Sequence, residues 1–225
     1  MASLAVIPAR GGSRRIPRKN IKEFLGHPII WYPIQAALRV FDKVVVSTED
    51  AEIKQIASQW KAEVIDRPLY LADDYTTTGE VATETAMLFP EYEVVGMLYP
   101  TAVFVTPELI RRAIDDLGDA DSIFTVIEYG HPIQRALTIE NGLMQFINQG
   151  LKTVRTQDLA PRYFDAGQLY IMKREALIKN RTMYSEKMRP LVIKDYEAQD
   201  LDTLDDWRVA EIKYEFLQGK GKERR

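Results

Sequence analysis

The chain has 225 residues, of which 46% are hydrophobic and 28% charged, and its formal net charge is -3. This composition is far from that of disordered, collagen-like or membrane-spanning chains, and the length fits one globular domain. The slight negative charge disfavours a protein that holds nucleic acid by bulk electrostatics. The absence of cysteine excludes a disulfide framework and a thiolate metal site. Because no signal peptide and no apolar run of about 18 residues is visible, we expect a cytoplasmic protein without a membrane span.

The first half of the chain alternates between short apolar runs and amphipathic stretches. Apolar runs bounded by turn residues predict buried strands at Leu4–Ile7, Val44–Val46, Val94–Leu98 and Ile123–Ile127. Apolar residues spaced at helical intervals predict helices at Ile29–Val40, Ala51–Trp60, Gly79–Phe89 and Pro107–Leu117. Pro33 predicts a late start or a bend in the first helix. The alternation predicts an α/β fold of three layers, in which a mostly parallel sheet is covered on both faces.

This alternation stops after about residue 128. Arg135–Ile139 and Leu143–Ile147 flank Glu140-Asn141-Gly142, which is a strong signal for a tight hairpin. A compact α/β sheet does not need such a hairpin. We therefore predict an arm at about residues 130–165, within a single domain that spans residues 1–225.

Regular structure is expected to resume after the arm. Gln168–Met172 predicts a further strand, and Leu204–Leu217 predicts a final helix. The glycine and lysine residues at 219–222 predict a frayed end.

The most informative segment is residues 7–20 (IPARGGSRRIPRKN), which directly follow the first predicted strand. Ligands of open α/β sheets bind beyond the carboxyl ends of the strands. Gly11 and Gly12 would let backbone amides approach a phosphate closely. Five basic side chains could neutralise a triphosphate: Arg10, Arg14, Arg15, Arg18 and Lys19. The segment matches neither a Walker A loop nor the dinucleotide fingerprint, and a solvated basic loop or a nucleic-acid contact are the alternative interpretations.

A pair of carboxylates lies near the other end of the chain. Asp200 and Asp202 precede the final helix and would project from one face of an extended segment. Mg²⁺ or Mn²⁺ could be held there together with phosphate oxygens and water. Spacing alone equally allows helix capping by Asp202 or Thr203, with Asp205 and Asp206 stabilising the positive end of the helix.

These segments together resemble the family of CMP-sialic acid synthetases, also called acylneuraminate cytidylyltransferases. The resemblance includes Val45–Asp50 and Arg67–Asp74 and so covers nearly the whole chain. It implies a Rossmann-like nucleotidyltransferase fold, with CTP as co-substrate. It assigns nucleotide binding to Ala9, Arg10, Gly11, Gly12, Ser13, Lys19, Asn20 and Arg67, and the metal to Asp200 and Asp202. Within these sets, Lys19, Arg10 and Asp202 are the catalytic candidates. Arg67 could instead be a surface arginine stiffened by Pro68.

Three segments indicate which acidic sugar is used. Tyr99 stands where the sialic acid branch has glutamine, and His131–Ala136 and Tyr163–Tyr170 resemble the pseudaminic acid branch. The resemblance therefore implies conversion of CTP and pseudaminic acid, an acidic nine-carbon sugar (a nonulosonic acid), to the CMP-sugar and pyrophosphate. The expected sugar-binding residues are Tyr99, Thr101, Gln134, Arg135, Tyr163, Asp165 and Gln168. The aromatic residues could equally belong to the core, and Arg135 to an interface salt bridge.

Several other functions stay open at this stage. An N-acetylneuraminate or 3-deoxy-manno-octulosonate cytidylyltransferase would share the core and the chemistry. An inactive nucleotide-sugar binding protein and an RNA-binding protein are the non-enzyme alternatives. We also expect a homodimer whose arm reaches the partner's sugar site, because five apolar residues of the arm would be exposed on a monomer: Phe146, Ile147, Leu151, Tyr163 and Phe164.

Overall fold

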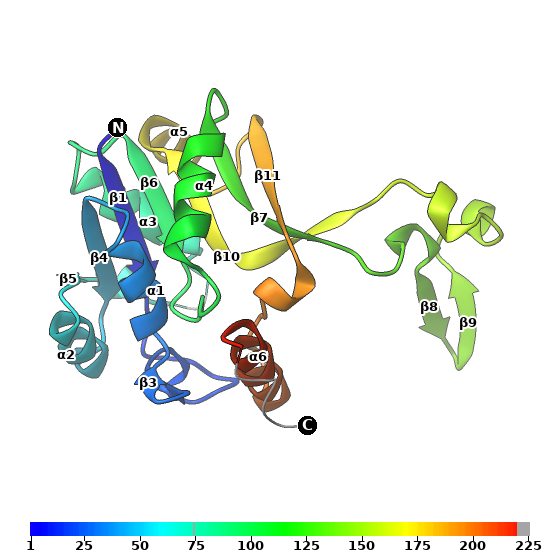
Figure 1. Ribbon diagram of the computed structural model, residues 1–225, viewed down its shortest axis with the longest axis horizontal. Helices are drawn as coiled ribbons and strands as arrows, with labels where there is room; N and C mark the ends of the chain where they lie inside the picture. The colour runs from blue at the N-terminus through cyan, green and yellow to red at the C-terminus, as the bar shows by residue number, and fades with distance from the viewer. Residues whose placement is uncertain (74, 220–225) are drawn as a thin grey trace.

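The computed structural model describes residues 1–73 and 75–219, and its centre is a seven-stranded sheet of order β11-β7-β10-β6-β1-β4-β5 (Figure 1). The strands are β1 Ser3–Pro8, β4 Lys43–Thr48, β5 Glu63–Asp66, β6 Val94–Leu98, β7 Ser122–Glu128, β10 Tyr163–Lys173 and β11 Met188–Ile193. Neighbouring strands are parallel except for β10, which runs antiparallel to both β6 and β7. The predicted mostly parallel sheet is confirmed.

Helices cover both faces of this sheet. They are α1 Trp31–Ala37, α2 Ala51–Gln59, α3 Thr78–Met87, α4 Pro107–Leu117, α5 Arg174–Asn180 and α6 Leu204–Leu217. In β1, Ala5 and Ile7 pack in one core with α1, α2 and α4, while Leu4 and Val6 pack in a second core with α3 and α5. Side chains alternate across a strand, so this single buried strand serves both cores and the three-layer prediction is confirmed. No helix in the described ranges has the length and apolar character needed to cross a bilayer.

Helix α1 begins two residues later than the apolar pattern alone predicts. It starts at Trp31, which places Pro33 in the first turn. The first backbone N–H groups of a helix have no intrahelical acceptor, so the missing N–H of proline removes no hydrogen bond there. The expected late start is therefore confirmed.

Helix α6 brings the C-terminal segment to the start of the chain. Trp207 on this helix and Leu201 just before it pack in a third core with Ile16 and Phe24. The ring of Trp207 meets that of Phe24 edge-on, with centroids 5.6 Å apart. This packing places the segment that carries Asp200 and Asp202 beside the loop after β1.

Several elements differ from the sequence-based expectation. Strands β5 and β11 and helix α5 were not expected, and neither was the short hairpin of β2 (Glu23–Phe24) and β3 (His27–Pro28). Strands β5 and β11 lie at the two edges of the sheet and expose half or more of their residues, so each has only a short apolar stretch, at Val64–Ile65 and Leu191–Ile193. Lys220 to Lys222 of the predicted frayed tail lie outside the described residues.

Strand β10 begins at Tyr163, five residues before the predicted start at Gln168. Its pairing with β7 shifts register between Asp165 and Tyr170, and Gly167 within this bulge has a φ of 63°. A left-handed residue of this kind favours glycine, which breaks the pattern that a strand prediction depends on.

Residues 129–162 form an arm that leaves the body of the molecule between β7 and β10 (Figure 1). Its hairpin consists of β8 (Leu137–Glu140) and β9 (Leu143–Phe146). Asn141 and Gly142 connect the strands with φ angles of 52° and 79°, as a tight turn with two left-handed residues requires. The predicted hairpin is confirmed.

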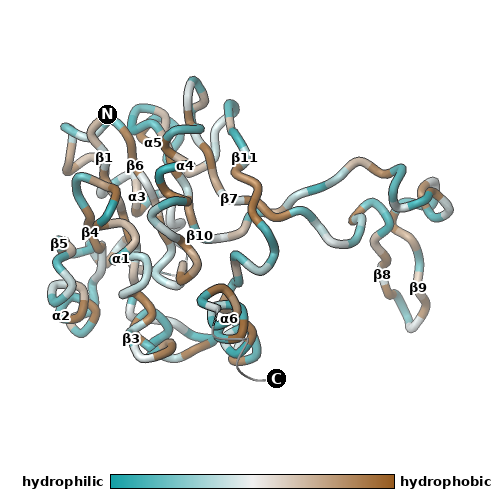
Figure 2. Tube along the Cα trace, viewed as in Figure 1, coloured by the Kyte–Doolittle hydropathy of each residue, from teal (hydrophilic) through white to brown (hydrophobic). Residues whose placement is uncertain are grey.

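Apolar side chains of the arm are exposed, although they are not all those expected. Figure 2 shows hydrophobic stretches along β8 and β9. Ile147 and Tyr163 are exposed as predicted, whereas Phe146, Leu151 and Phe164 are half-buried. The other large hydrophobic residues exposed on the arm are Tyr129, Ile133, Leu137, Ile139, Leu143 and Met144.

Candidate active site

A cavity of about 560 Å³ lies beyond the end of β1 and is lined by residues from both ends of the chain. Nine of the predicted site residues line it: Arg10, Ser13, Lys19, Asn20, Arg67, Tyr99, Thr101, Asp200 and Asp202. The structure thus brings the basic loop and the C-terminal carboxylates to one site.

The other predicted residues do not line this cavity. Ala9, Gly11 and Gly12 belong to the same loop, and the buried Ala9 donates its N–H to the Ser47 carbonyl at 3.0 Å. Gln134 and Arg135 lie on the arm, where the Gln134 amide donates to the Ala160 carbonyl at 2.6 Å. Within the described part of the chain, the buried Nε of Arg135 has no hydrogen-bond partner.

The β10 residues predicted to bind sugar lie beside the cavity. Gln168 is buried and its amide donates to the Glu197 carbonyl at 3.3 Å. Asp165 Oδ2 accepts hydrogen bonds from the hydroxyls of Tyr170 and Tyr184, each at 2.8 Å, and Oδ1 accepts from Gly167 N–H at 2.8 Å. The Asp165 carboxylate therefore holds two tyrosines and the bulge of β10 in place.

These tyrosines support the wall of the cavity. The ring of Tyr170 meets that of Tyr99 edge-on at 5.9 Å between centroids. Burial, and then the hydrogen bond to Asp165, raises the pKa of Tyr184 to about 12, so its hydroxyl stays protonated and donates. Tyr163 at the start of β10 is 44% exposed and pairs with Glu128.

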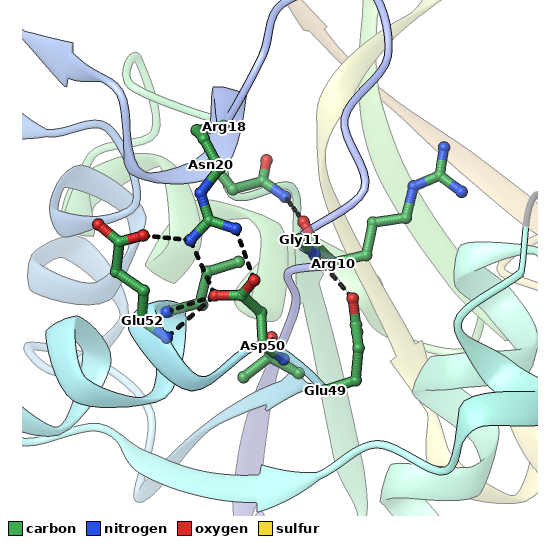
Figure 3. Close-up of polar contacts among 9 residues, drawn as sticks. Arg10, Gly11, Arg18, Asn20, Glu49, Asp50 and Glu52 are labelled. Atoms are coloured by element: carbon green, nitrogen blue, oxygen red, sulfur yellow. Dashed lines mark hydrogen bonds and ion pairs between the residues drawn. The ribbon is translucent and has the colours of Figure 1, made fainter.

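Figure 3 shows how the loop between β1 and the short 3₁₀ turn Lys19–Ile21 is held. The Asn20 amide donates to the Arg10 carbonyl at 2.9 Å, and Gly11 N–H donates to Glu49 Oε1 at 2.7 Å. The Gly11 amide, expected to face a phosphate, therefore already has a carboxylate acceptor. Arg18 also differs from expectation, because its guanidinium pairs with Asp50 rather than lining the cavity.

Lys19 lies between the loop and the carboxylates. Its ammonium donates to the Leu201 carbonyl at 2.7 Å and lies 3.8 Å from Asp202 Oδ1. Burial lowers the pKa of Lys19, and the charges of Asp202 and Asp200 oppose that shift. A partly desolvated ammonium interacts more strongly with a phosphate than one in bulk water.

The side chains of Asp200 and Asp202, the two candidate metal ligands, do not cap helix α6. Thr203 is the N-cap of α6, and its hydroxyl accepts the Asp206 N–H at 3.1 Å. The Asp206 carboxylate in turn accepts the N–H groups of Thr203 at 2.7 Å and of Asp202 at 3.2 Å. Asp200 and Asp202 are consequently left to face the cavity, where Asp202 pairs with Arg15.

The two carboxylates fit Mg²⁺ better than a metal whose ligands must all come from the protein. In the described residues no group of three or more histidine, aspartate or glutamate side chains could hold a metal. Mg²⁺ is commonly bound by one or two carboxylates, and its other ligands are phosphate oxygens and water. Basic side chains line the same cavity, and they suit the phosphates whose oxygens would complete the coordination of Mg²⁺.

Arg67 is a buried residue and not the exposed arginine of the alternative interpretation. Its side chain lines the cavity, and the residue is 6% exposed. The guanidinium donates to the Ser47 carbonyl at 2.6 Å. Burial lowers the pKa of Arg67, and the nearby Glu49 opposes this.

Sequence reasoning did not identify the part of the cavity contributed by α3 and the residues just before it. Thr76, Thr78 and Val81 line the cavity, and the Thr78 hydroxyl lies 3.4 Å from that of Tyr99. The signal available was the capping-box spacing of Thr77 and Glu80, which the structure forms. It locates the helix start, whereas the proximity of this start to β1 and β6 is a tertiary property.

The sheet, the basic loop and the carboxylate pair define an α/β protein with a cavity lined by basic and acidic side chains at the carboxyl end of its central strands. The family model described as "Cytidylyltransferase" matches residues 4–215. The chain belongs to the cytidylyltransferase family and is a nucleotidyltransferase enzyme. The resemblance inferred from the sequence is confirmed.

Individual relatives cover nearly the entire chain. A pseudaminic acid cytidylyltransferase of Campylobacter jejuni is 34% identical and spans 95% of this chain and 97% of the relative. The CMP-N,N'-diacetyllegionaminic acid synthase of Legionella pneumophila is 32% identical over 97% of this chain and 98% of its own length. A CMP:2-keto-3-deoxy-manno-octonic acid synthetase, solved in complex with CTP, shares the fold with a TM-score of 0.70 at 16% identity, covering 97% of this chain and 100% of that one.

Proposed function

We propose that this enzyme transfers the cytidylyl group of CTP to pseudaminic acid. The supporting observation is that the basic loop after β1 and the carboxylates before α6 converge on one cavity although Arg15 and Asp202, which pair there, are 187 positions apart. The anomeric hydroxyl of the sugar attacks the α-phosphorus and gives up its proton to a carboxylate of the site or to water. The bond between the α-phosphorus and the oxygen that bridges to the β-phosphorus breaks, and pyrophosphate leaves.

The chain's own residues bind and orient both substrates in this proposal. Arg10 and Arg67 neutralise the triphosphate, the Ser13 hydroxyl donates a hydrogen bond to it, and Asn20 holds the loop in position beside it. Lys19 faces the transferring phosphate, where a fixed charge has most effect as negative charge develops. Asp200 and Asp202 would hold Mg²⁺, which supplies charge neutralisation on the α-phosphate when bound.

The choice of sugar is supported by two observations. The relatives named as pseudaminic acid cytidylyltransferases include the Campylobacter jejuni protein, which matches this chain over nearly its full length. In addition, Tyr99 and Thr101 line the cavity, with Tyr170 packed behind Tyr99. An aromatic wall suits a sugar whose side chain ends in a methyl group. We place the reaction in the cytoplasm, with no nucleic acid or membrane as partner.

A substrate panel tests this function. Pyrophosphate release should be fastest with CTP and pseudaminic acid, and slower with UTP or ATP as the nucleotide. N,N'-diacetyllegionaminic, N-acetylneuraminic and 3-deoxy-manno-octulosonic acids serve as competing sugars, and the Asp202→Asn protein gives the background. Faster turnover of any competing sugar would reassign the substrate, and no pyrophosphate release with any sugar would favour a nucleotide-sugar binding protein.

We further propose a homodimer in which the arm completes the partner's sugar site. Among residues 1–73 and 75–219, the hydrophobic cores do not include the exposed apolar residues of the hairpin, such as Ile139, Leu143 and Met144. Arg135 carries a buried Nε without a partner in the described residues, which suits an interface or a sugar carboxylate. A two-fold axis would make the contact isologous and give two equivalent sites.

Mixing inactive variants tests the shared site. Arg135→Ala damages the arm and Asp202→Asn damages the body, so each homodimer should be nearly inactive. If the arm acts on the partner, heterodimers contain one intact site out of two and activity should return on mixing. No recovery on mixing, or a monomer by light scattering at assay concentration, would contradict this proposal.

A further inference from the structure

The nucleotide loop is tied at two points to the same corner of the fold, where β4 ends and α2 begins. At its start, Gly11 N–H donates to Glu49 Oε1 at 2.7 Å. Near its end, the Arg18 guanidinium pairs with Asp50 through two parallel hydrogen bonds, of 2.5 Å to Oδ2 and 2.9 Å to Oδ1. Figure 3 shows these acidic side chains reaching the loop from one side, while Arg10 extends away from them.

The corner that receives these contacts is itself rigid. Asp50 is the N-cap of α2, and its Oδ1 accepts the N–H groups of Glu52 and Ile53 at 3.0 Å each. Its own N–H donates to the Thr48 hydroxyl at 3.1 Å. Asp50 therefore links the loop to a strand and a helix whose backbones are fixed by the core.

The loop adopts a conformation that needs such contacts. Arg18 has a φ of 55°, in the left-handed region that non-glycine residues adopt at a cost. A Cβ at Gly11 would lie 2.3 Å from the Asp50 carboxylate, so only glycine allows the loop to pack this closely. The left-handed conformation of Arg18 and the close packing of Gly11 persist because the contacts to Glu49 and Asp50 stabilise the loop by more than these two features cost.

The Arg18–Asp50 pair is ionised throughout the working pH range. The hydrogen bond to Asp50 raises the pKa of Arg18, and the same bond lowers the pKa of Asp50 to about 2. Glu52 adds a second carboxylate contact to Arg18, at 2.5 Å. A bidentate charge-assisted pair of this kind fixes orientation as well as distance.

We propose that Arg18, Asp50 and Glu49 form a loop latch, a set of positioning residues that pre-orders the loop for CTP without touching the nucleotide. The loop that the latch holds in place contributes Arg10, Ser13, Lys19 and Asn20 to the lining of the cavity. The latch reduces the ordering entropy lost when CTP binds, and so acts on nucleotide affinity. It rests on the proposed function only in that CTP binds this loop.

The test compares CTP affinity with sugar affinity in latch variants. Arg18→Gln and Asp50→Asn should each raise the CTP Kd and the KM for CTP by about tenfold, which is the loss expected from one charge-assisted contact. The KM for the sugar should stay within about twofold, because the loop and not the sugar wall is loosened. Asparagine still caps a helix, so Asp50→Asn should fold normally. The double variant should bind CTP no more weakly than either single variant, because both substitutions remove the same ion pair.

Two controls make the result specific to the loop. Arg189→Gln removes a comparable ion pair, 2.6 Å from Asp119, that lies away from the cavity, and it should leave the CTP Kd unchanged. Glu49→Gln keeps an acceptor for Gly11 N–H and should retain affinity, whereas Glu49→Ala should lose it. Wild-type CTP affinity in both single latch variants, additive losses in the double variant, or an equal rise of both KM values would overturn the latch while the proposed function stands. Absence of CTP binding to the wild-type protein would overturn both.

Discussion

Asp202→Asn should lower kcat by about a thousandfold or more while the protein remains folded, since it removes one of two carboxylates available to Mg²⁺. Asparagine keeps nearly the same volume. The N-cap of α6 is Thr203, supported by Asp206, so the helix start does not depend on Asp202. The free energy of unfolding should consequently change by less than about 1 kcal/mol. The measurements are pyrophosphate release at saturating CTP and sugar, and thermal unfolding.

Asp205 supplies a matched control for this variant. It lies three positions further along the same segment, is exposed, and pairs with Arg208 at 3.0 Å without lining the cavity. Asp205→Asn should retain wild-type kcat. If Asp202→Asn were fully active at ordinary Mg²⁺ concentration, the metal assignment would be wrong.

Lys19→Ala should lower kcat by about a hundredfold or more, with a smaller loss of CTP affinity. The ammonium is held by the Leu201 carbonyl at 2.7 Å and faces the cavity, so it is fixed before the reaction begins. A fixed charge aimed at the transferring phosphate stabilises the transition state more than the bound substrate. Single-turnover rates and the CTP Kd separate these effects.

The neighbouring Lys22 is the control for Lys19. Its ammonium lies 5.5 Å from the centroid of the Trp207 ring and outside the cavity lining, so Lys22→Ala should leave kcat unchanged. Weaker CTP binding with an unchanged chemical rate in Lys19→Ala would move Lys19 from catalysis to ground-state binding.

Elements with a strong local signal are the ones that sequence reasoning located well. Strands β1, β4, β6 and β7 are buried apolar runs, and the turn at Asn141-Gly142 needs residues that tolerate positive φ. Edge strands β5 and β11 escaped prediction because half-exposed strands carry mixed residues whose identity depends on which neighbour they pair with. The antiparallel direction of β10 likewise depends on the path of the arm before it.

Part of the cavity lining was predicted from the sequence, because a glycine-containing basic loop after the first strand and a carboxylate pair before the last helix are local patterns. Which side chains face the ligand was decided only by tertiary contacts. Arg10 and Arg18 stand in the same basic run, yet Arg10 lines the cavity while Arg18 pairs with Asp50, 32 positions away. Asp202 and Thr203 were both candidates for the N-cap, and α6 uses Thr203, supported by Asp206, which leaves Asp202 beside Lys19. The physical reason is that ionic and capping partners must be close in space. Their distances are set by packing across the third core and cannot be read from residue spacing.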